Sequence, residues 1–358
     1  MRIRGGGSKD FLGQSFEGEV LDTRSCSGIV SHEPSELVVT VRAGTPLAEL
    51  EAQLARHGQC LPFEPPHFAH AKGDGPLESC ATVGGMVASG LSGPARASAG
   101  AVRDFVLGVQ LINGRGELLT FGGQVMKNVA GYDVSRLMAG AMGTLGVLAE
   151  VSLKVLPVAP SETTLAFEWD AASALAALHR WGGLPLPLNA SCWVQDQGRS
   201  LLFVRLRGAV AAVEAACRTM GGQRMDSANV RRDWTDCGEQ RLPFFRAPAP
   251  DLSLWRVSVA QTAPAVALAG VSPDAQLIEW HGGQRWLWAP ATQAATLRAE
   301  AQALGGHATL FRPACDADRA QGVFTPTAPA LQAIQQRLRG EFDPAGIFNP
   351  GRMATFAA

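Results

Sequence analysis

Three consecutive glycines and a serine, Gly5-Gly6-Gly7-Ser8, follow the short strand-like segment 2–4 near the start of the 358-residue chain. Glycine has no Cβ, so its backbone can take positive φ and turn several N–H groups toward one point. A nest of this kind binds phosphate oxygens, and the Ser8 hydroxyl adds a further donor. The loop matches neither the Walker A sequence nor GxGxxG. A plain flexible turn is the alternative interpretation.

A second stretch of small residues, 81–93, contains Thr82, Gly84, Gly85, Ser89 and Gly90. Apolar residues stand between these small ones at spacings that suit a tight turn and a short helix. Without bulky side chains, such a segment can pack closely against a flat or charged group. Helix–helix packing through small residues explains the pattern equally well.

Two further segments are rich in glycine and turn residues: 128–147, which includes Gly146 and Val147, and 342–352, which includes Asn349 and Arg352. Tyr132, the only tyrosine, lies in the first of them. A core aromatic with its hydroxyl satisfied is the simplest interpretation of that tyrosine. The second segment can equally be a turn-rich C-terminal tail.

Composition narrows the class of protein. Hydrophobic residues make up 46% and charged residues 18%, so the chain can bury a sizeable core, and its length suggests two domains. A net charge of −1 argues against a nucleic-acid-binding protein. The seven cysteines form no CxxC pair, which argues against a zinc site or an iron–sulfur cluster held by this chain alone. With no signal peptide and no apolar run of about 18 residues, we expect a cytoplasmic protein.

The elements of the first 157 residues are predicted from hydrophobic periodicity and turn residues. A buried strand is expected at 37–41, followed by a helix with Thr45 as N-cap and Leu47, Leu50 and Leu54 on its apolar face. A hairpin is expected from 105–112 and 117–121, joined at Asn113-Gly114. A short helix at 134–142 and a strand at 147–156 complete this part.

Beyond a proline-rich boundary at 157–160, strand-like runs alternate with alanine-rich helices. This pattern predicts an α+β arrangement with an antiparallel sheet. The expected strands lie at 163–169, 201–206, 252–258, 276–280 and 285–288, and the helices at 171–180, 209–220, 290–304 and 328–339. We therefore expect a first domain at 1–157, a second at 158–341, and a segment at 342–358 that returns to the first domain.

The order and spacing of these motifs resemble the FAD-binding domain shared by the vanillyl-alcohol oxidase and p-cresol methylhydroxylase (PCMH) flavoproteins. The phrases that carry the resemblance include RIRGGGSKDFLG, ATVGGMVASGLSGP, GTLGVLAEVSLKVLP and FDPAGIFNPGRM. Within that family the chain looks most similar to the FAD-binding subunits of bacterial glycolate oxidases. The resemblance implies a PCMH-type domain of two subdomains followed by an α+β cap domain.

The resemblance also implies a set of cofactor-binding residues. The loop 5–8 would hold the FAD pyrophosphate, and the stretch 82–90 would run past the pyrophosphate and the flavin ring. The strand after the GTLG turn would meet the adenine, and the NPG turn would return near the flavin. The implied residues are Gly5, Gly6, Gly7, Ser8, Thr82, Gly84, Gly85, Ser89, Gly90, Gly146, Val147, Asn349 and Arg352.

The chemistry implied is oxidation of a 2-hydroxy acid such as glycolate, with electrons passing through FAD to an iron–sulfur subunit. Relatives that link FAD to histidine often carry it in the glycine-rich loop, and no histidine lies between Met1 and Val30. The expected FAD is therefore non-covalent. A homologous catalytic flavoprotein subunit and an iron–sulfur subunit are the implied partners, through which the complex could reach the membrane.

Two features depart from the family's catalytic branch. Related hydroxy-acid dehydrogenases carry paired histidines that bind a divalent metal; this chain shows no such pair, and no metal is expected. His307 and Arg312 are the candidates for binding an acid, with a capped turn as the alternative. A stand-alone dehydrogenase and a scaffold subunit with a decayed flavin site remain alternatives. Relatives also have an extra helix and strand before the glycine loop.

Overall fold

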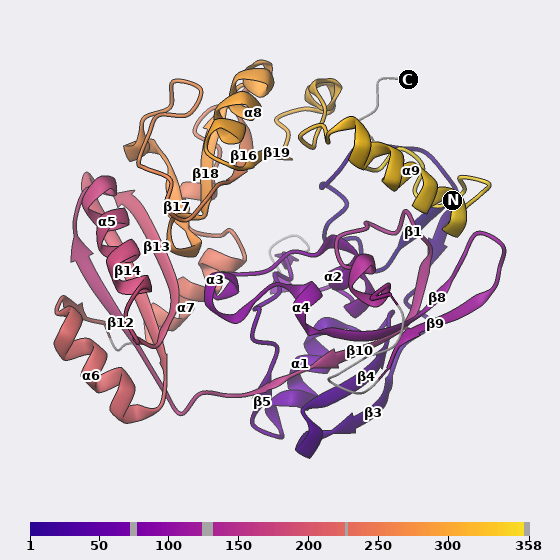
Figure 1. Ribbon diagram of the computed structural model, residues 1–358, viewed down its shortest axis with the longest axis horizontal. Coiled ribbons are helices and arrows are strands. Elements are labelled where there is room, and N and C mark those ends of the chain that lie inside the picture. Colours follow the sequence, from indigo (N-terminus) through magenta and orange to yellow (C-terminus); the bar gives the residue numbers. More distant parts are fainter. Residues whose placement is uncertain (72–76, 124–131, 226–227, 354–358) are drawn as a thin grey trace. The chain divides into compact units, whose positions relative to one another are not determined.

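The computed structural model describes residues 1–71, 77–123, 132–225 and 228–353 (Figure 1). The chain divides into two compact units. Unit 1 comprises Met1–Ser92, Gly100–Val158 and Pro326–Ala358, and unit 2 comprises Gly93–Ala99 and Ala159–Thr325. The chain thus returns to unit 1 at Pro326, before the position 342 expected from sequence, because Leu338 and Phe342 pack against the core of unit 1.

Unit 1 is built on a five-stranded antiparallel sheet of order β3-β4-β10-β8-β9. Its hairpin β8–β9 pairs Ile112 with Leu118, which confirms the hairpin expected at Asn113-Gly114. The strands of unit 1 are β1 Arg2–Arg4, β2 Val20–Asp22, β3 Ile29–Glu33, β4 Val38–Arg42, β5 Gln59–Cys60, β6 His70–Ala71, β7 Leu77–Glu78, β8 Val106–Ile112, β9 Leu118–Gly122, β10 Val147–Lys154 and β11 Leu156–Pro157.

Helices cover one face of this sheet and form the core with it. Alternate residues of β4, β8 and β10, among them Val41, Leu111 and Leu153, point to the helices, as expected of strands with one face buried. Burial of this apolar surface is the main force that holds unit 1 together. The helices of unit 1 are α1 Leu47–Ala55, α2 Val83–Ser89, α4 Val102–Phe105, α9 Pro329–Phe342 and the 3₁₀ helices η1 Pro34–Glu36 and η2 Ser135–Met138.

Two local expectations are wrong. Thr45 does not cap α1: its hydroxyl donates to the Arg42 carbonyl (2.7 Å) and accepts from the Gly28 N–H (2.9 Å), so the helix begins at Leu47 after Pro46. The helix expected at 134–142 is only the 3₁₀ turn η2, because glycines follow it at once and Gly140 takes a φ of +85°. At Thr45 a contact with Gly28, which is distant in sequence, overrides local propensity, whereas at 134–142 the local glycines end the helix.

Unit 2 contains an eight-stranded antiparallel sheet of order β15-β12-β14-β13-β17-β18-β16-β19. This confirms the antiparallel sheet expected for the second part, although β13 and β19 were not among the predicted strands. The strands are β12 Ser161–Glu168, β13 Leu188–Asp196, β14 Arg199–Gly208, β15 Gln223–Arg224, β16 Ser253–Ser258, β17 Leu277–Glu279, β18 Gln284–Ala289 and β19 His307–Arg312.

Two helical layers cover one face of this sheet. The helices α5 and α6 pack on β12–β14, and α8 packs on β16, β18 and β19. The opposite face carries more polar residues, including Glu279, which accepts hydrogen bonds from Trp286 (2.6 Å) and Gln284 (3.1 Å). The helices of unit 2 are α3 Arg96–Ala99, α5 Ala171–Gly182, α6 Val210–Met220, α7 Ala228–Gly238, α8 Ala294–Ala303 and the 3₁₀ helices η3 Pro243–Phe245, η4 Pro273–Ala275, η5 Trp280–Gly282, η6 Ala291–Gln293 and η7 Asp316–Gln321.

His281, in η5, makes the stability of unit 2 sensitive to pH. Its ring nitrogens contact the hydroxyls of Ser191 and Ser98 (both 3.0 Å), and burial lowers its pKa to about 4. Between pH 6.5 and 4 the unfolded chain binds a proton that the folded chain does not. We therefore expect the free energy of unfolding to fall with decreasing pH in this window, by at most about 1.4 kcal/mol per pH unit from this group.

Urea unfolding of the full chain between pH 7 and pH 4.5 measures this effect. The variant His281→Asn is the comparison, because asparagine tolerates the left-handed φ of 56° at this position. Its stability should depend less steeply on pH than that of the unchanged protein. Equal slopes for the two proteins would show that His281 is not the group responsible.

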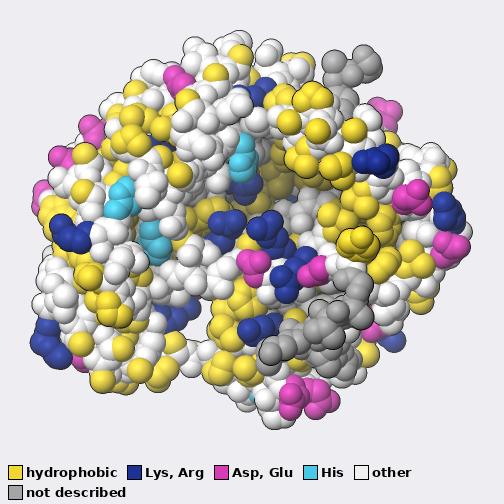
Figure 2. Space-filling view, viewed as in Figure 1, with side chains coloured by type: hydrophobic (Ala, Val, Ile, Leu, Met, Phe, Trp, Pro, Cys, Tyr) yellow, Lys and Arg dark blue, Asp and Glu magenta, His cyan; other side chains and the backbone are white. Residues whose placement is uncertain are grey.

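The surface carries both signs of charge. Figure 2 shows basic and acidic side chains close to one another over the visible face, with apolar side chains scattered between them. This mixture agrees with the net charge of −1.

Candidate functional site

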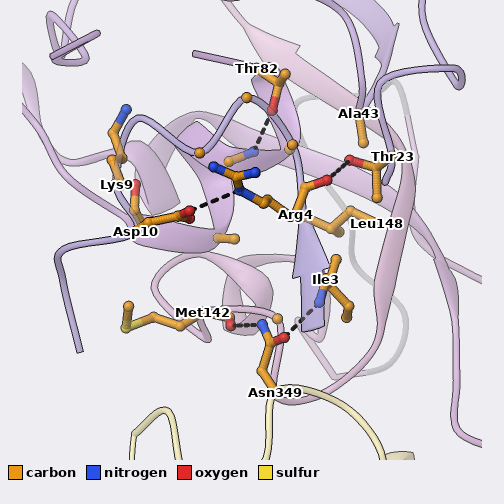
Figure 3. A pocket seen from close by; sticks show the side chains of 18 of the residues that line it. Ile3, Arg4, Lys9, Asp10, Thr23, Ala43, Thr82, Met142, Leu148 and Asn349 are labelled. Carbon is orange, nitrogen blue, oxygen red and sulfur yellow. Dashed lines mark hydrogen bonds and ion pairs between the residues drawn. The ribbon is translucent and has the colours of Figure 1, made fainter. Parts of the chain in front are cut away.

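One pocket of unit 1 is lined by most of the residues that the sequence assigned to a cofactor. It lies where β1, the loop after it, α2 and the C-terminal turn meet (Figure 3). Ile3, Ala43, Met142 and Leu148 give it apolar walls. The predicted residues that line it are Gly5, Gly6, Gly7, Ser8, Thr82, Gly84, Gly85, Ser89, Gly146, Asn349 and Arg352.

The glycine loop fits against the segment before α2 so closely that side chains have no room. A Cβ on Gly6 would lie 1.4 Å from the Cys80 carbonyl oxygen, and one on Gly5 would lie 2.3 Å from the Thr82 hydroxyl oxygen. Gly7 takes a φ of +78°, a conformation that glycine adopts without steric cost. The three glycines are therefore required by the geometry of the loop, which argues against a plain flexible turn.

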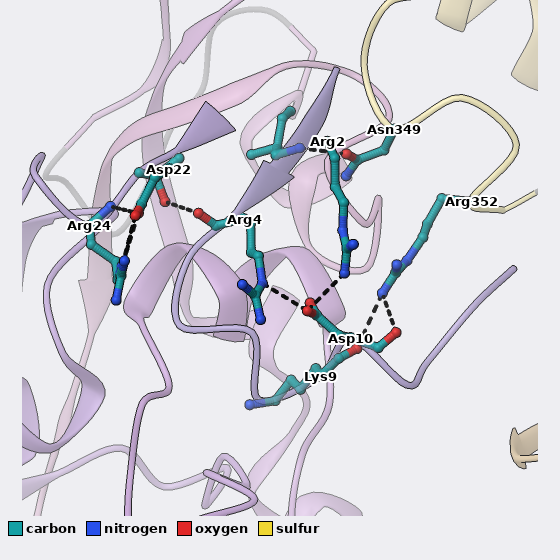
Figure 4. A network of polar contacts seen from close by, with 10 residues as sticks. Arg2, Arg4, Lys9, Asp10, Asp22, Arg24, Asn349 and Arg352 are labelled. Carbon is teal, nitrogen blue, oxygen red and sulfur yellow. Dashed lines mark hydrogen bonds and ion pairs between the residues drawn. The ribbon is translucent and has the colours of Figure 1, made fainter. Parts of the chain in front are cut away.

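The Asp10 residue connects the two sides of the glycine loop through hydrogen bonds. Asp10 accepts from the guanidinium groups of Arg2 (2.9 Å) and Arg4 (2.8 Å), and its backbone N–H donates to the Gly7 carbonyl (3.1 Å) (Figure 4). Arg352, from the C-terminal segment, donates to the carbonyls of Lys9 and Asp10 (3.2 and 3.3 Å). These bonds restrain the conformation of the loop.

The charge of the pocket favours an anion. Among the described residues that line it, four side chains are basic, those of Arg2, Arg4, Lys9 and Arg352, and one is a carboxylate, that of Asp10. Asp22 lies just outside the lining and is paired with Arg24 at 2.6 Å (Figure 4), which lowers its pKa to about 2 and keeps it ionised. An excess of positive charge beside a glycine-rich loop is the arrangement expected for a phosphate-binding site.

The helix α2 is fixed at both of its ends. Thr82 caps its N-terminus by accepting from the Gly85 N–H (3.2 Å), and the Gly84 N–H donates to the Ala43 carbonyl (2.7 Å). At the other end, the Gly140 N–H donates to the Val87 carbonyl (2.9 Å). The small residues of α2 therefore line the pocket and also allow close packing against neighbouring backbone.

Asn349 joins the last segment of unit 1 to the first. Its side chain accepts from the Ile3 N–H (2.8 Å) and donates to the Met142 carbonyl (2.7 Å), as Figure 3 shows. The backbone N–H of Asn349 also donates to the Met1 carbonyl (3.0 Å). Asn349 thus sets the position of β1 and of the turn at Met142 while it lines the pocket.

Two predicted residues lie outside the lining of this pocket. Gly90 ends α2 with a φ of +63°, and a Cβ there would lie 2.9 Å from the Gly140 backbone, so this glycine serves helix packing. Val147 begins β10 with its side chain in the protein interior. The sequence interpretation did not name the basic residues Arg2 and Arg4, although their i, i+2 spacing on one strand places both on the same side.

The remaining candidates lie elsewhere. His307 and Arg312 are on β19 in unit 2, where they pair in register with Ser258 and Leu254 of β16. Tyr132, for which a core position was the simplest interpretation, is 94% exposed. Among the described residues, no group of three or more His, Cys, Asp or Glu could hold a metal ion, and no described helix is long and apolar enough to cross a membrane.

Comparison with known proteins agrees with this geometry. The family model described as "FAD binding domain" matches residues 1–122. Glycolate oxidase subunit GlcE of Escherichia coli K12 is 43% identical over 98% of this chain and 91% of its own length. Glycolate oxidase subunit GlcD of Bacillus subtilis 168 is 22% identical over 94% of this chain and 79% of its own length.

Solved structures extend the comparison to the fold. Alkyldihydroxyacetonephosphate synthase superposes with a TM-score of 0.64 over 97% of this chain and 71% of its own, at 16% identity. This likeness and the domain match confirm the α+β fold and define the class, a protein with a PCMH-type FAD-binding domain. The chain belongs to the family of the glycolate oxidase subunit GlcE.

Proposed function

We propose that this chain is the FAD-binding subunit of a multisubunit oxidase acting on glycolate or a similar 2-hydroxy acid. The observation that supports this most is the pocket beside β1. A glycine loop without room for side chains and four of the described basic residues line it together. The family membership and the match to an FAD-binding domain support the same assignment.

Within the pocket, we assign the FAD pyrophosphate to the loop 5–8. The backbone N–H groups of this loop and the guanidinium of Arg4 are the donors that would bind the pyrophosphate. Asp10 holds Arg4 in place through a hydrogen bond. The wall made by α2 and Ala43 has small side chains, which suits a flat ring system. Bound FAD would supply an acceptor for the hydride that leaves C2 of the hydroxy acid.

We propose that the FAD is bound non-covalently. Histidine is absent from residues 1–31, and the described residues that line the pocket include neither histidine nor cysteine. The purified chain should therefore show flavin absorption near about 370 and 450 nm, and acid precipitation should release all of the flavin into the supernatant. Flavin that stays with the precipitate would contradict non-covalent binding, and a colourless protein that added FAD does not restore would contradict the assignment itself.

The partners follow from the family. GlcE and GlcD are by name subunits of glycolate oxidase, so we propose that this chain assembles with a homologous catalytic flavoprotein subunit. An iron–sulfur subunit as electron acceptor is part of the same proposal, with the complex in the cytoplasm or attached to the membrane through its partners. We propose unit 1 as the FAD-binding domain and unit 2 as a cap domain that forms substrate or subunit contacts.

A further inference from the structure

A second pocket lies within unit 2, between the sheet and α7 (Figure 1). Two hydrogen bonds hold α7 on the face of the sheet that α5 and α6 leave open. The Trp234 indole N–H donates to the Thr164 hydroxyl (2.9 Å), and the Cys237 thiol donates to the Glu279 carboxylate (3.3 Å). The pocket has a volume of about 320 Å³, which is large enough for a small organic ligand.

The walls of this pocket are mainly apolar and aromatic. Phe203 comes from β14, Trp234 from α7 and Phe244 from η3, so three different elements each contribute a ring. Val194 of β13 and Val230 of α7 add aliphatic surface. Phe203 and Phe244 are only half-buried, and their rings are therefore available to cover the apolar part of a ligand.

The charged groups of the lining are acidic. Asp196 ends β13 and Asp233 lies in α7, and neither carboxylate forms a hydrogen bond or ion pair with another described residue. Burial, and then the charge of Asp236, raise the pKa of Asp233, with a smaller opposite effect of Arg232. Among the described residues that line the pocket there is no lysine, arginine or histidine, so its charge favours a cation.

The arginines nearest to the pocket are directed to other partners. Arg199, which is opposite Asp196 in register, pairs with Glu168 at 2.7 Å. The guanidinium of Arg205 lies over the Trp234 ring, 4.9 Å from its centre. This contact shows that an aromatic ring in this part of unit 2 already accepts a cation on its face.

We propose that this pocket binds a small organic cation, an ammonium group attached to an aromatic or aliphatic body. The carboxylates of Asp196 and Asp233 would attract the ammonium group, while Phe203 and Phe244 would contact its apolar body. A metal ion is disfavoured, because the described residues include no cluster of three side chains able to ligate one. The site is distinct from the flavin pocket and does not depend on the function proposed for the chain.

Isothermal titration calorimetry of the full flavin-containing chain tests the proposal with three ligands of similar shape and different charge. The ligands are 2-phenylethylamine, 2-phenylethanol and 3-phenylpropionate. We expect the amine to bind saturably at low salt with a Kd on the order of 1 mM or lower. It should bind at least about fivefold more tightly than the alcohol, since partly exposed carboxylates contribute modestly, and the propionate should bind most weakly.

Two changes separate the charge of the pocket from its shape. Asp196→Asn combined with Asp233→Asn should remove the preference for the amine over the alcohol, because asparagine keeps the shape and loses the charge. Phe244→Ala should weaken both ligands alike through loss of an apolar wall. Asp251→Asn is the matched control, because Asp251 is an exposed aspartate of unit 2 outside the pocket lining.

Four results would overturn the site. They are absence of saturable binding at about 10 mM amine, equal affinity for amine and alcohol, an unchanged preference in the double variant, and an equal loss of preference in Asp251→Asn. A cooperative urea transition shows that each variant is folded. Flavin absorbance reports separately on the pocket of unit 1, so the two proposals can fail independently.

Discussion

Replacing Gly6 by alanine should abolish flavin binding. The new Cβ would lie 1.4 Å from the Cys80 carbonyl oxygen. Because the Cβ is fixed to the backbone of the loop and the oxygen is itself a backbone atom, this clash can be relieved only if the loop moves away from α2. Movement of the loop separates the N–H groups from the arginines that should bind the pyrophosphate together. We expect FAD affinity to fall by at least about 100-fold, measured by fluorescence titration of the flavin-free chain.

The control for this change is Gly340→Ala in α9 of the same unit. A Cβ at Gly340 meets nothing within 4 Å, and alanine in a helix is about 1 kcal/mol more favourable than glycine. This variant should keep its flavin and unfold at the same or a slightly higher temperature. Full flavin occupancy in Gly6→Ala, with a cooperative unfolding transition, would show that the loop does not hold the cofactor.

Replacing Asn349 by alanine should have the second-largest effect, on stability and on flavin content together. The substitution leaves the Ile3 N–H and the Met142 carbonyl without their partners and places alanine at a φ of 42°. Two buried polar groups left unsatisfied predict a loss of about 2–4 kcal/mol in the free energy of unfolding, measured by urea denaturation. Flavin should be lost because β1 and the Met142 turn both border the pocket.

The variant Asn349→Asp separates the two bonds. An aspartate can still accept from the Ile3 N–H, but its second carboxylate oxygen would face the Met142 carbonyl oxygen in place of the donor. Repulsion between these oxygens should make this variant at pH 7 no more stable than the alanine variant. Gln336→Ala, at an exposed position of α9, should change stability by less than about 0.5 kcal/mol. Wild-type stability and flavin content in Asn349→Ala would rule out the connecting role of this residue.

Local sequence patterns predicted the elements whose conformation is determined by residues close together in the sequence. The spacing of Leu47, Leu50 and Leu54 gave α1, and Asn113-Gly114 gave the hairpin β8–β9, because periodicity and turn residues act over a few positions. The glycine loop could be recognised in the sequence for the same reason, because its glycines are consecutive. Its role was inferred only from the order of several motifs along the chain, which no single motif could supply.

The features that sequence patterns missed depend on contacts between distant residues. Arg352 reaches the carbonyls of Lys9 and Asp10 across more than 340 positions, and no local pattern signals that bond. Thr45 satisfied every rule for an N-cap, yet the Arg42 carbonyl and the Gly28 N–H take its hydroxyl. The pocket of unit 2 is lined by residues of β13, β14 and α7, which only the fold brings together.

Asn349 bonds to Ile3 across 346 positions, and this has a consequence for biosynthesis. The ribosome synthesises the glycine loop before the whole of unit 2 and Asn349 after it. The nascent chain therefore has to keep unit 1 incomplete while unit 2 folds, and contacts of such separation close slowly. We expect flavin to be captured in its final site only after Asn349 has been synthesised, which makes free FAD at that moment a determinant of yield.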